Sequence, residues 1–209
     1  MKDTLLRVGR NTVFISIEKV IEVLASIATV AIVARYLSIE LVGQYIFIVT
    51  VVGFLLMGSF AGLERILIRN ISREKERTNY YLHGAVTVRN IMFVSILCIL
   101  SMLLFFMHFD KTSLIATGIF ITSEFLSYQG LTYMAIFKAY ERMEYNTVIT
   151  FVTKIITLGA TALAVYLDLG FISVFLAITA GNLFKSITAF SLFKKLKLSG
   201  PTIRNSISN

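Results

Sequence analysis

Residues 83–107 read HGAVTVRNIMFVSILCILSMLLFFM, and from residue 91 onward this stretch contains no charged side chain. An α-helix needs about 20 predominantly apolar residues to cross the hydrocarbon core of a bilayer. The stretch is therefore predicted to span a membrane. Other runs of similar length flank it, and the predicted spans are residues 11–34, 41–63, 83–107, 113–137, 146–167 and 171–193.

The composition of the 209 residues supports this interpretation. Hydrophobic residues make up 56% and charged residues 15%, and the mean hydropathy is +0.80. Soluble globular chains are about 45–50% apolar and about 25% charged. The runs leave little sequence for loops, which excludes a soluble enzyme domain and a membrane anchor with a large attached domain. We expect one all-α integral membrane domain over residues 1–209, a six-transmembrane-helix bundle.

The net charge of +8 is distributed unevenly between alternate loops. On one side lie Lys2, Arg7, Arg10, Arg65, Arg69, Arg73, Lys75, Arg77, Lys138, Arg142, Lys194, Lys195, Lys197 and Arg204. The opposite loops contain Arg35 and Lys111. Cytoplasmic loops of membrane proteins are enriched in Lys and Arg. The pattern predicts a multi-pass protein of the cell membrane with both termini cytoplasmic, and it accounts for the charge without a nucleic-acid partner.

The longest predicted loop, residues 64–82, contains the basic, amphipathic stretch ERILIRNISREKER at residues 64–77. Such a stretch predicts a short helix on the inner surface of the membrane. Alternatively, its cations act only as a topology determinant. Residues 194–209 are expected to form a cytoplasmic tail.

Several charged residues fall inside the predicted spans, namely Glu18, Lys19, Glu22, Arg89, Glu124, Lys154 and Lys185. A charge at the bilayer centre costs at least ~2.5–3.5 kcal/mol, so these side chains should pair, face the bundle interior or line water. In the first span, Lys19 is spaced to form a salt bridge with Glu22. The polar face that carries them is either a self-neutralised cluster or the wall of a hydrated cavity.

The other spans contribute further polar candidates. Thr147, Thr150, Lys154, Thr157 and Thr161 form a polar stripe on the fifth span. Glu124 is either a proton- or ion-coupling carboxylate or the partner of Lys154. Lys185 is expected to snorkel to the inner interface, and Arg89 to face a cytoplasmic vestibule or lipid headgroups. The candidate cavity residues are Glu18, Lys19, Glu22, Arg89, Glu124, Lys154 and Asn182.

Signals of catalysis and of cofactor binding are absent from the sequence. There is no Gly-rich phosphate loop, no HExxH motif and no nucleophile elbow. His83 and His108 are predicted on opposite sides of the membrane, so they cannot share a metal ion. The single cysteine, Cys98, cannot form an intrachain disulfide. We therefore expect neither an enzyme nor a bound cofactor or metal.

Four segments carry a family resemblance: residues 17–45 (IEKVIEVLASIATVAIVARYLSIELVGQY), 61–74 (AGLERILIRNISRE), 82–90 (LHGAVTVRN) and 123–146 (SEFLSYQGLTYMAIFKAYERMEYN). They resemble the polysaccharide biosynthesis, or O-antigen-type lipid-linked oligosaccharide, flippases of the multidrug/oligosaccharidyl-lipid/polysaccharide superfamily. The resemblance implies two six-helix lobes around a central cavity, alternating access, and a polyprenyl-diphosphate-linked oligosaccharide as substrate. On matching positions it implies roles for Glu18, Lys19, Arg35 and Arg89, whereas Glu22 departs from the family pattern.

The resulting functional hypothesis is export of a lipid-diphosphate-linked oligosaccharide for surface polysaccharide synthesis. Lys19, Lys154 and Arg89 would attract the diphosphate, and Glu18, Glu22 and Asn182 would contact sugar hydroxyls or couple an ion. One alternative is a cation-coupled multidrug antiporter, in which Glu22 and Glu124 are the working residues. Because 209 residues equal one lobe, a truncated product, an inactive assembly half, or a half that pairs with a second copy or second half is also expected.

Overall fold

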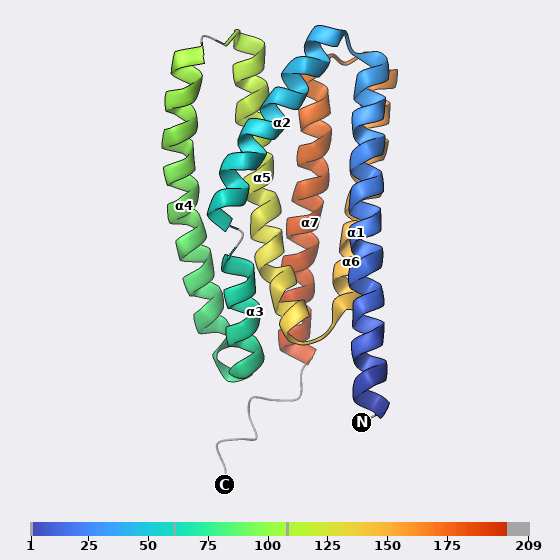
Figure 1. Ribbon diagram of the computed structural model, residues 1–209, viewed down its shortest axis with the longest axis vertical. Coiled ribbons are helices and arrows are strands. Elements are labelled where there is room, and N and C mark those ends of the chain that lie inside the picture. Colours follow the sequence, from blue (N-terminus) through green and yellow to red (C-terminus); the bar gives the residue numbers. More distant parts are fainter. Residues whose placement is uncertain (1, 61, 108, 200–209) are drawn as a thin grey trace.

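The computed structural model describes residues 2–60, 62–107 and 109–199, and all regular structure in these residues is helical (Figure 1). The elements are α1 (Lys2–Tyr36), α2 (Ile39–Phe60), α3 (Leu63–Arg73), the 3-10 turn η1 (Lys75–Arg77), α4 (Thr78–Met107), α5 (Lys111–Ala139), α6 (Met143–Tyr166) and α7 (Phe171–Ser199). The all-α fold predicted from the sequence is confirmed.

Within the described residues, α2, α4, α6 and α7 are long and apolar enough to cross a membrane. Each of the other two predicted spans also coincides with a long helix, α1 or α5. Both of these helices carry the charged and hydroxyl side chains that reduce their apolar character. The chain is therefore a helical multi-pass membrane protein, and the count of six spans stays a prediction.

Several helices begin or end at other residues than the predicted spans, whose membrane boundaries stay predictions. The second span was expected to reach residue 63, but α2 ends at Phe60 and a separate helix, α3, begins at Leu63. The tail was expected to begin at residue 194, but α7 continues through Ser199. Residues 194–199 (KKLKLS) contain no glycine or proline, and Gly200 and Pro201 follow directly after them. The rest of the predicted tail, residues 200–209, lies outside the described residues.

The long helices run up and down along one axis, and α7 lies among them (Figure 1). It packs along α5 on one side and along α6 on the other, and α1 packs along α6. The largest apolar cluster joins α2, α4, α5 and α7 through residues such as Val52, Leu100, Phe120 and Phe175. The N-terminus and the end of α7 lie at the same end of the bundle, the end at which α3 is found (Figure 1).

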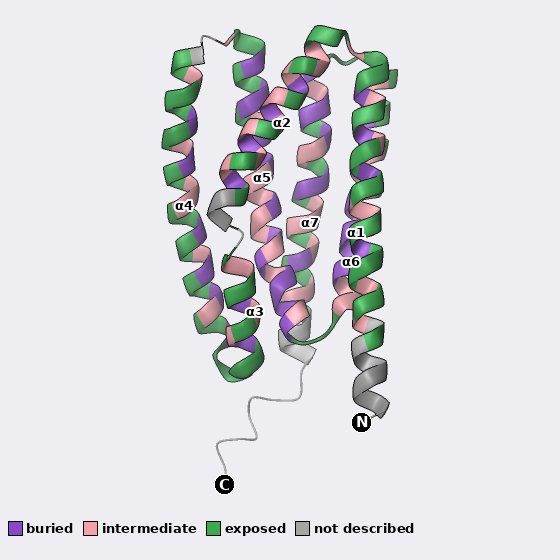
Figure 2. Ribbon diagram, in the orientation of Figure 1, coloured by how far each residue is buried: buried purple, intermediate pink, exposed green. Residues whose placement is uncertain are grey.

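Large apolar side chains cover much of the outer surface, and on α4 the exposed positions lie on the side away from the bundle (Figure 2). Phe54, Phe105 and Met102 are respectively 79%, 80% and 64% exposed. Soluble monomers rarely expose continuous apolar surface of this kind. The outer surface of the bundle is therefore suited to lipid.

The predicted basic loop, residues 64–82, folds as α3, η1 and the first turns of α4. The prediction of a short helix is confirmed, and its location at the inner membrane surface stays a prediction. Leu67 and Ile71 of α3 are buried against Leu82 of α4 and Ile136 of α5. The helix runs alongside the bundle (Figure 1), and its apolar face is occupied by protein, so that face is not available to insert into a bilayer.

Candidate functional site

A pocket of about 400 Å³ opens between α1, α2, α5, α6 and α7. Its lining combines apolar residues with hydroxyl groups and two opposite charges. The polar lining residues are Ser26, Thr29, Tyr45, Thr50, Glu124, Lys154 and Thr157, and the apolar ones include Val30, Phe120 and Ile178. Lys154 and Glu124, predicted from the sequence to line a cavity, are both in its wall.

Three of the hydroxyl groups in this wall donate to their own helices. Ser26 Oγ donates to the carbonyl of Glu22 at 2.7 Å and Thr29 Oγ1 to that of Ala25 at 2.8 Å. Thr157 Oγ1 donates to the carbonyl of Thr153 at 3.0 Å. A hydroxyl whose proton is used in this way offers only its lone pairs to a ligand. These parts of the wall therefore act as hydrogen-bond acceptors.

Glu124 is held by α7 and not by Lys154. Asn182 Nδ2 donates to Ser123 Oγ at 2.9 Å and to Glu124 Oε1 at 3.4 Å. No ion pair joins Glu124 to Lys154 in the part of the chain that the structure describes. Of the two alternatives stated for Glu124, the pair with Lys154 is therefore not formed, and the carboxylate contacts Asn182 of α7 instead.

One turn along the same interface, Lys185 Nζ donates to Ser127 Oγ. The expectation that Lys185 snorkels to the interface is wrong, since its ammonium group contacts a buried serine of the neighbouring helix α5. Lys185 is also within electrostatic range of Glu124 and Lys154. Lys185 therefore belongs with the candidate residues, although its position in the sequence predicts an interfacial role.

The charged residues of α1 divide between two environments. Lys19 Nζ and Glu22 Oε2 form the predicted salt bridge at 2.6 Å, with side chains that are 69% and 44% exposed. Glu18 is only 8% exposed and accepts from Thr150 Oγ1 of α6 at 3.5 Å. Of the predicted polar face of α1, Glu18 thus serves the α1–α6 contact, and Lys19 and Glu22 lie on the open side.

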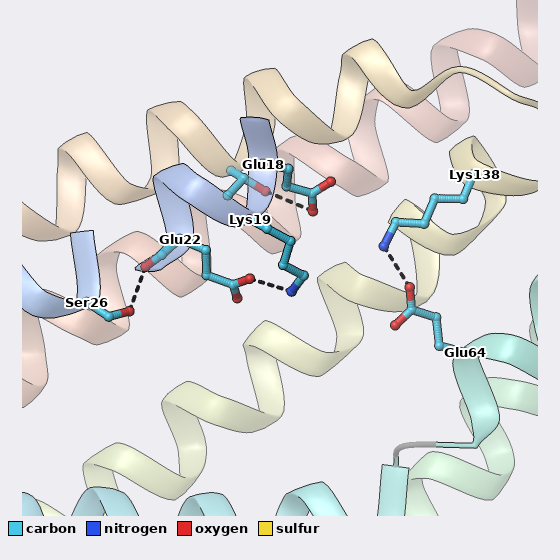
Figure 3. Close-up of polar contacts among 7 residues, drawn as sticks. Glu18, Lys19, Glu22, Ser26, Glu64 and Lys138 are labelled. Atoms are coloured by element: carbon cyan, nitrogen blue, oxygen red, sulfur yellow. Dashed lines mark hydrogen bonds and ion pairs between the residues drawn. The ribbon is translucent and has the colours of Figure 1, made fainter. Parts of the chain in front are cut away.

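A second ion pair lies near this group, between Lys138 Nζ of α5 and Glu64 Oε1 of α3 at 2.8 Å (Figure 3). Glu64 is within electrostatic range of Lys19, and Lys138 is within range of Glu18. From the sequence, Glu64 and Lys138 are expected to lie in loops. No local pattern could have identified them, because they are 74 residues apart and meet only when α3 packs on α5.

Arg89 is 2% exposed and lies between α4 and α5. Its guanidinium donates to the backbone carbonyl of Tyr128 and lies 5.8 Å from the centre of the Tyr128 ring. The expectation that Arg89 faces a vestibule or lipid headgroups is wrong, because the packing of α4 on α5 encloses the side chain. Arg89 is not among the residues that line the pocket.

No curated protein and no solved structure matches the chain. A family model described as "Polysaccharide biosynthesis protein" matches residues 8–208. The match includes every helix that lines the pocket as well as α3. The chain belongs to the polysaccharide biosynthesis protein family.

Proposed function

We propose that the chain moves a lipid-diphosphate-linked oligosaccharide across the cytoplasmic membrane by alternating access, for synthesis of a surface polysaccharide. Membership of the polysaccharide biosynthesis family and the apolar helices support the coarser statement, a membrane protein of polysaccharide biosynthesis. The observation that carries the finer proposal is the chemical character of the pocket between α1, α2, α5, α6 and α7.

The pocket wall is rich in acceptors and contains one ammonium group. Ser26, Thr29 and Thr157 present hydroxyl lone pairs, and Glu124 adds a carboxylate. A sugar carries many O–H donors, which these acceptors satisfy. Lys154 supplies N–H donors and a compact positive charge, which suits a phosphate oxygen. A ligand with many hydroxyls and an anionic group complements this set.

Lys19, which pairs with Glu22, is a second cation and lies on the open side of α1. We propose that Lys19 meets the diphosphate outside the pocket and that Lys154 meets it inside. Arg89 is not among the residues proposed to meet the diphosphate, because its guanidinium donates to the carbonyl of Tyr128 of α5. Movement of the anion from Lys19 toward Lys154 would then follow the polar face of α1.

The test is complementation of a bacterial strain that lacks its own oligosaccharide flippase. Lys154→Ala is expected to abolish surface polysaccharide, and Lys154→Arg to retain part of it, because arginine keeps the charge. Lys111→Ala is the matched control, since Lys111 is an exposed lysine at the start of α5 and does not line the pocket. Full complementation by correctly inserted Lys154→Ala protein would overturn the proposal.

A second candidate, a cation-coupled multidrug antiporter, is supported by the Glu124 carboxylate in the pocket wall. It predicts efflux of a cationic dye that depends on a proton or sodium gradient and is lost in Glu124→Gln. Dye efflux without polysaccharide complementation would favour this function over the first.

A further inference from the structure

α3 has two faces of different character. Leu67 and Ile71 are buried against α4 and α5. Arg65, Arg69 and Arg73 are exposed. Their four-residue spacing places the three guanidinium groups on the same side of the helix. The packing of the apolar face on the bundle thus turns a row of arginines outward.

Two acidic residues near this row are engaged elsewhere, whereas Glu76 is exposed beyond the end of the row. Glu64 pairs with Lys138 of α5 at 2.8 Å. Glu74 pairs with Arg77 at 3.5 Å and accepts from the hydroxyl of Tyr81 at 2.9 Å. Among the described residues, none of the three arginines of the row forms an ion pair within the chain. The row therefore keeps its positive charge for an outside partner.

A surface hollow of about 450 Å³ continues the row at the end of α3. It is lined by residues 72–77, in which the cations Arg73, Lys75 and Arg77 alternate with the carboxylates of Glu74 and Glu76. Its three cations outnumber its two carboxylates, so the hollow adds net positive charge at the end of the arginine row. Its position extends the positive surface from α3 onto η1.

The length of α4 places α3 at the level of lipid headgroups. α4 has 30 residues, which at ~1.5 Å per residue gives about 45 Å. The hydrocarbon core is about 30 Å thick, so about 15 Å of α4 projects beyond it. The first turns of α4, TNYYLH at residues 78–83, are polar and are therefore the part suited to project beyond the hydrocarbon core. Leu82 in these turns packs on α3.

We propose that the exposed arginine face of α3 binds the phosphate groups of anionic lipids in the surrounding leaflet. Basic residues next to a membrane span attract anionic headgroups, and the fork of a guanidinium matches phosphate geometry. Since α3 stands beside the bundle, the face opposite its buried residues looks outward into the lipid. This favours lipid over an acidic protein, and the proposal does not depend on what the pocket transports.

The chain contains no tryptophan, so Ile66→Trp creates a single fluorescent probe next to the arginine row. Ile66 is 57% exposed, and the substitution should not disturb packing. The full chain is reconstituted in vesicles of phosphatidylcholine with about one fifth phosphatidylglycerol. In one set the phosphatidylglycerol is brominated, and in the other an equal amount of the phosphatidylcholine is brominated. Bromine quenches tryptophan at short range.

We expect brominated phosphatidylglycerol to quench about twice as strongly as brominated phosphatidylcholine at equal abundance. The excess should disappear in Arg65→Gln/Arg69→Gln/Arg73→Gln, and it should fall at about 1 M salt, where charges are screened within about 3 Å. The matched control is Arg35→Gln/Lys111→Gln, which removes exposed cations outside α3 and should keep the excess.

Equal quenching by the two brominated lipids would overturn the proposal and leave an acidic protein or a topology role for the arginines. An excess that persists in the folded triple variant would also overturn it. Inorganic phosphate is added in a further arm, with chloride at the same ionic strength as reference. Loss of the excess with phosphate but not with chloride would show that the arginines bind the lipid through its phosphate group, as proposed.

Discussion

At the scale of single residues, the structure separates charges that the sequence groups together. Glu18, Lys19 and Glu22 lie within five positions, yet Glu18 is enclosed by α6 while Lys19 and Glu22 remain half open. In an α-helix, each residue is rotated by about 100° relative to the one before it. A difference of one residue in sequence therefore decides between a helix contact and an open surface.

Asp110 gives a prediction at this scale. Its carboxylate precedes α5 and accepts from the backbone amides of Thr112 at 3.0 Å and Ser113 at 3.3 Å. The hydrogen bond with the Ser113 side chain, and then those amide bonds, lower the pKa of Asp110. A lowered pKa in the folded state stabilises the protein above the pKa of the unfolded chain, and this stabilisation is lost as pH falls through the folded pKa.

We expect Asp110→Asn to lower the melting temperature slightly at neutral pH and to reduce its fall in acid, below about pH 4. Asparagine still caps a helix but carries no charge. Thermal unfolding of both proteins in neutral detergent, over a pH series, measures the effect. Identical pH profiles would show that Asp110 does not contribute a titrating cap.

At the scale of elements, the bundle is held where small residues let helices approach. The α6–α7 contact passes through Gly181, where an added Cβ would lie 2.0 Å from Thr157 Oγ1 and 3.3 Å from the Thr153 carbonyl. The α5–α7 contact passes through Gly130, whose Cβ would lie 3.2 Å from the backbone of Ser186. Small residues at such points allow van der Waals packing between membrane helices.

Gly181→Ala is therefore expected to destabilise the protein by about 1–3 kcal/mol, because the new methyl group displaces the Thr157 side chain. Thr157 lines the pocket, so transport should fall as well. Thermal unfolding in detergent and the complementation assay measure the two effects.

Gly159→Ala on α6 is the control for Gly181→Ala, since an added Cβ there meets nothing within 4 Å. The double variant Gly181→Ala/Thr157→Ala should recover part of the lost stability, because it removes the hydroxyl in closest conflict. If Gly181→Ala is as stable as the control, the close approach of α6 and α7 is wrong.

At the scale of the whole molecule, the apolar outer surface and the shared end of the termini suggest how the chain sits in a bilayer. α3, the N-terminus and the end of α7 lie at one end, and the α4–α5 connection lies at the other (Figure 1). The uneven distribution of Lys and Arg predicts that the α3 end is cytoplasmic.

Cysteine labelling tests this orientation in a Cys98→Ser background, which is free of native cysteine. Ser72→Cys reports on the α3 end and Thr112→Cys on the opposite end, and both positions are exposed. A membrane-impermeant maleimide added to intact cells should label Thr112→Cys and should label Ser72→Cys only after lysis. The reverse pattern would invert the predicted topology.

The sequence by itself determined the properties that depend on short stretches of chain. Apolar runs predicted the long helices, the amphipathic stretch at residues 64–77 predicted a helix between α2 and α4, and three-residue spacing predicted the Lys19–Glu22 salt bridge. The family resemblance agreed with the match over residues 8–208. These predictions succeed because helix formation and pairing at close spacing are local.

Only the tertiary structure decided which faces of the helices meet. It paired Glu64 with Lys138 and Asn182 with Glu124, and it enclosed Arg89 behind Tyr128. It also turned the apolar side of α3 to the bundle and its arginines outward. Helix periodicity specifies the angle between side chains on one helix, but the rotation and partner of that helix depend on close packing with segments distant in sequence.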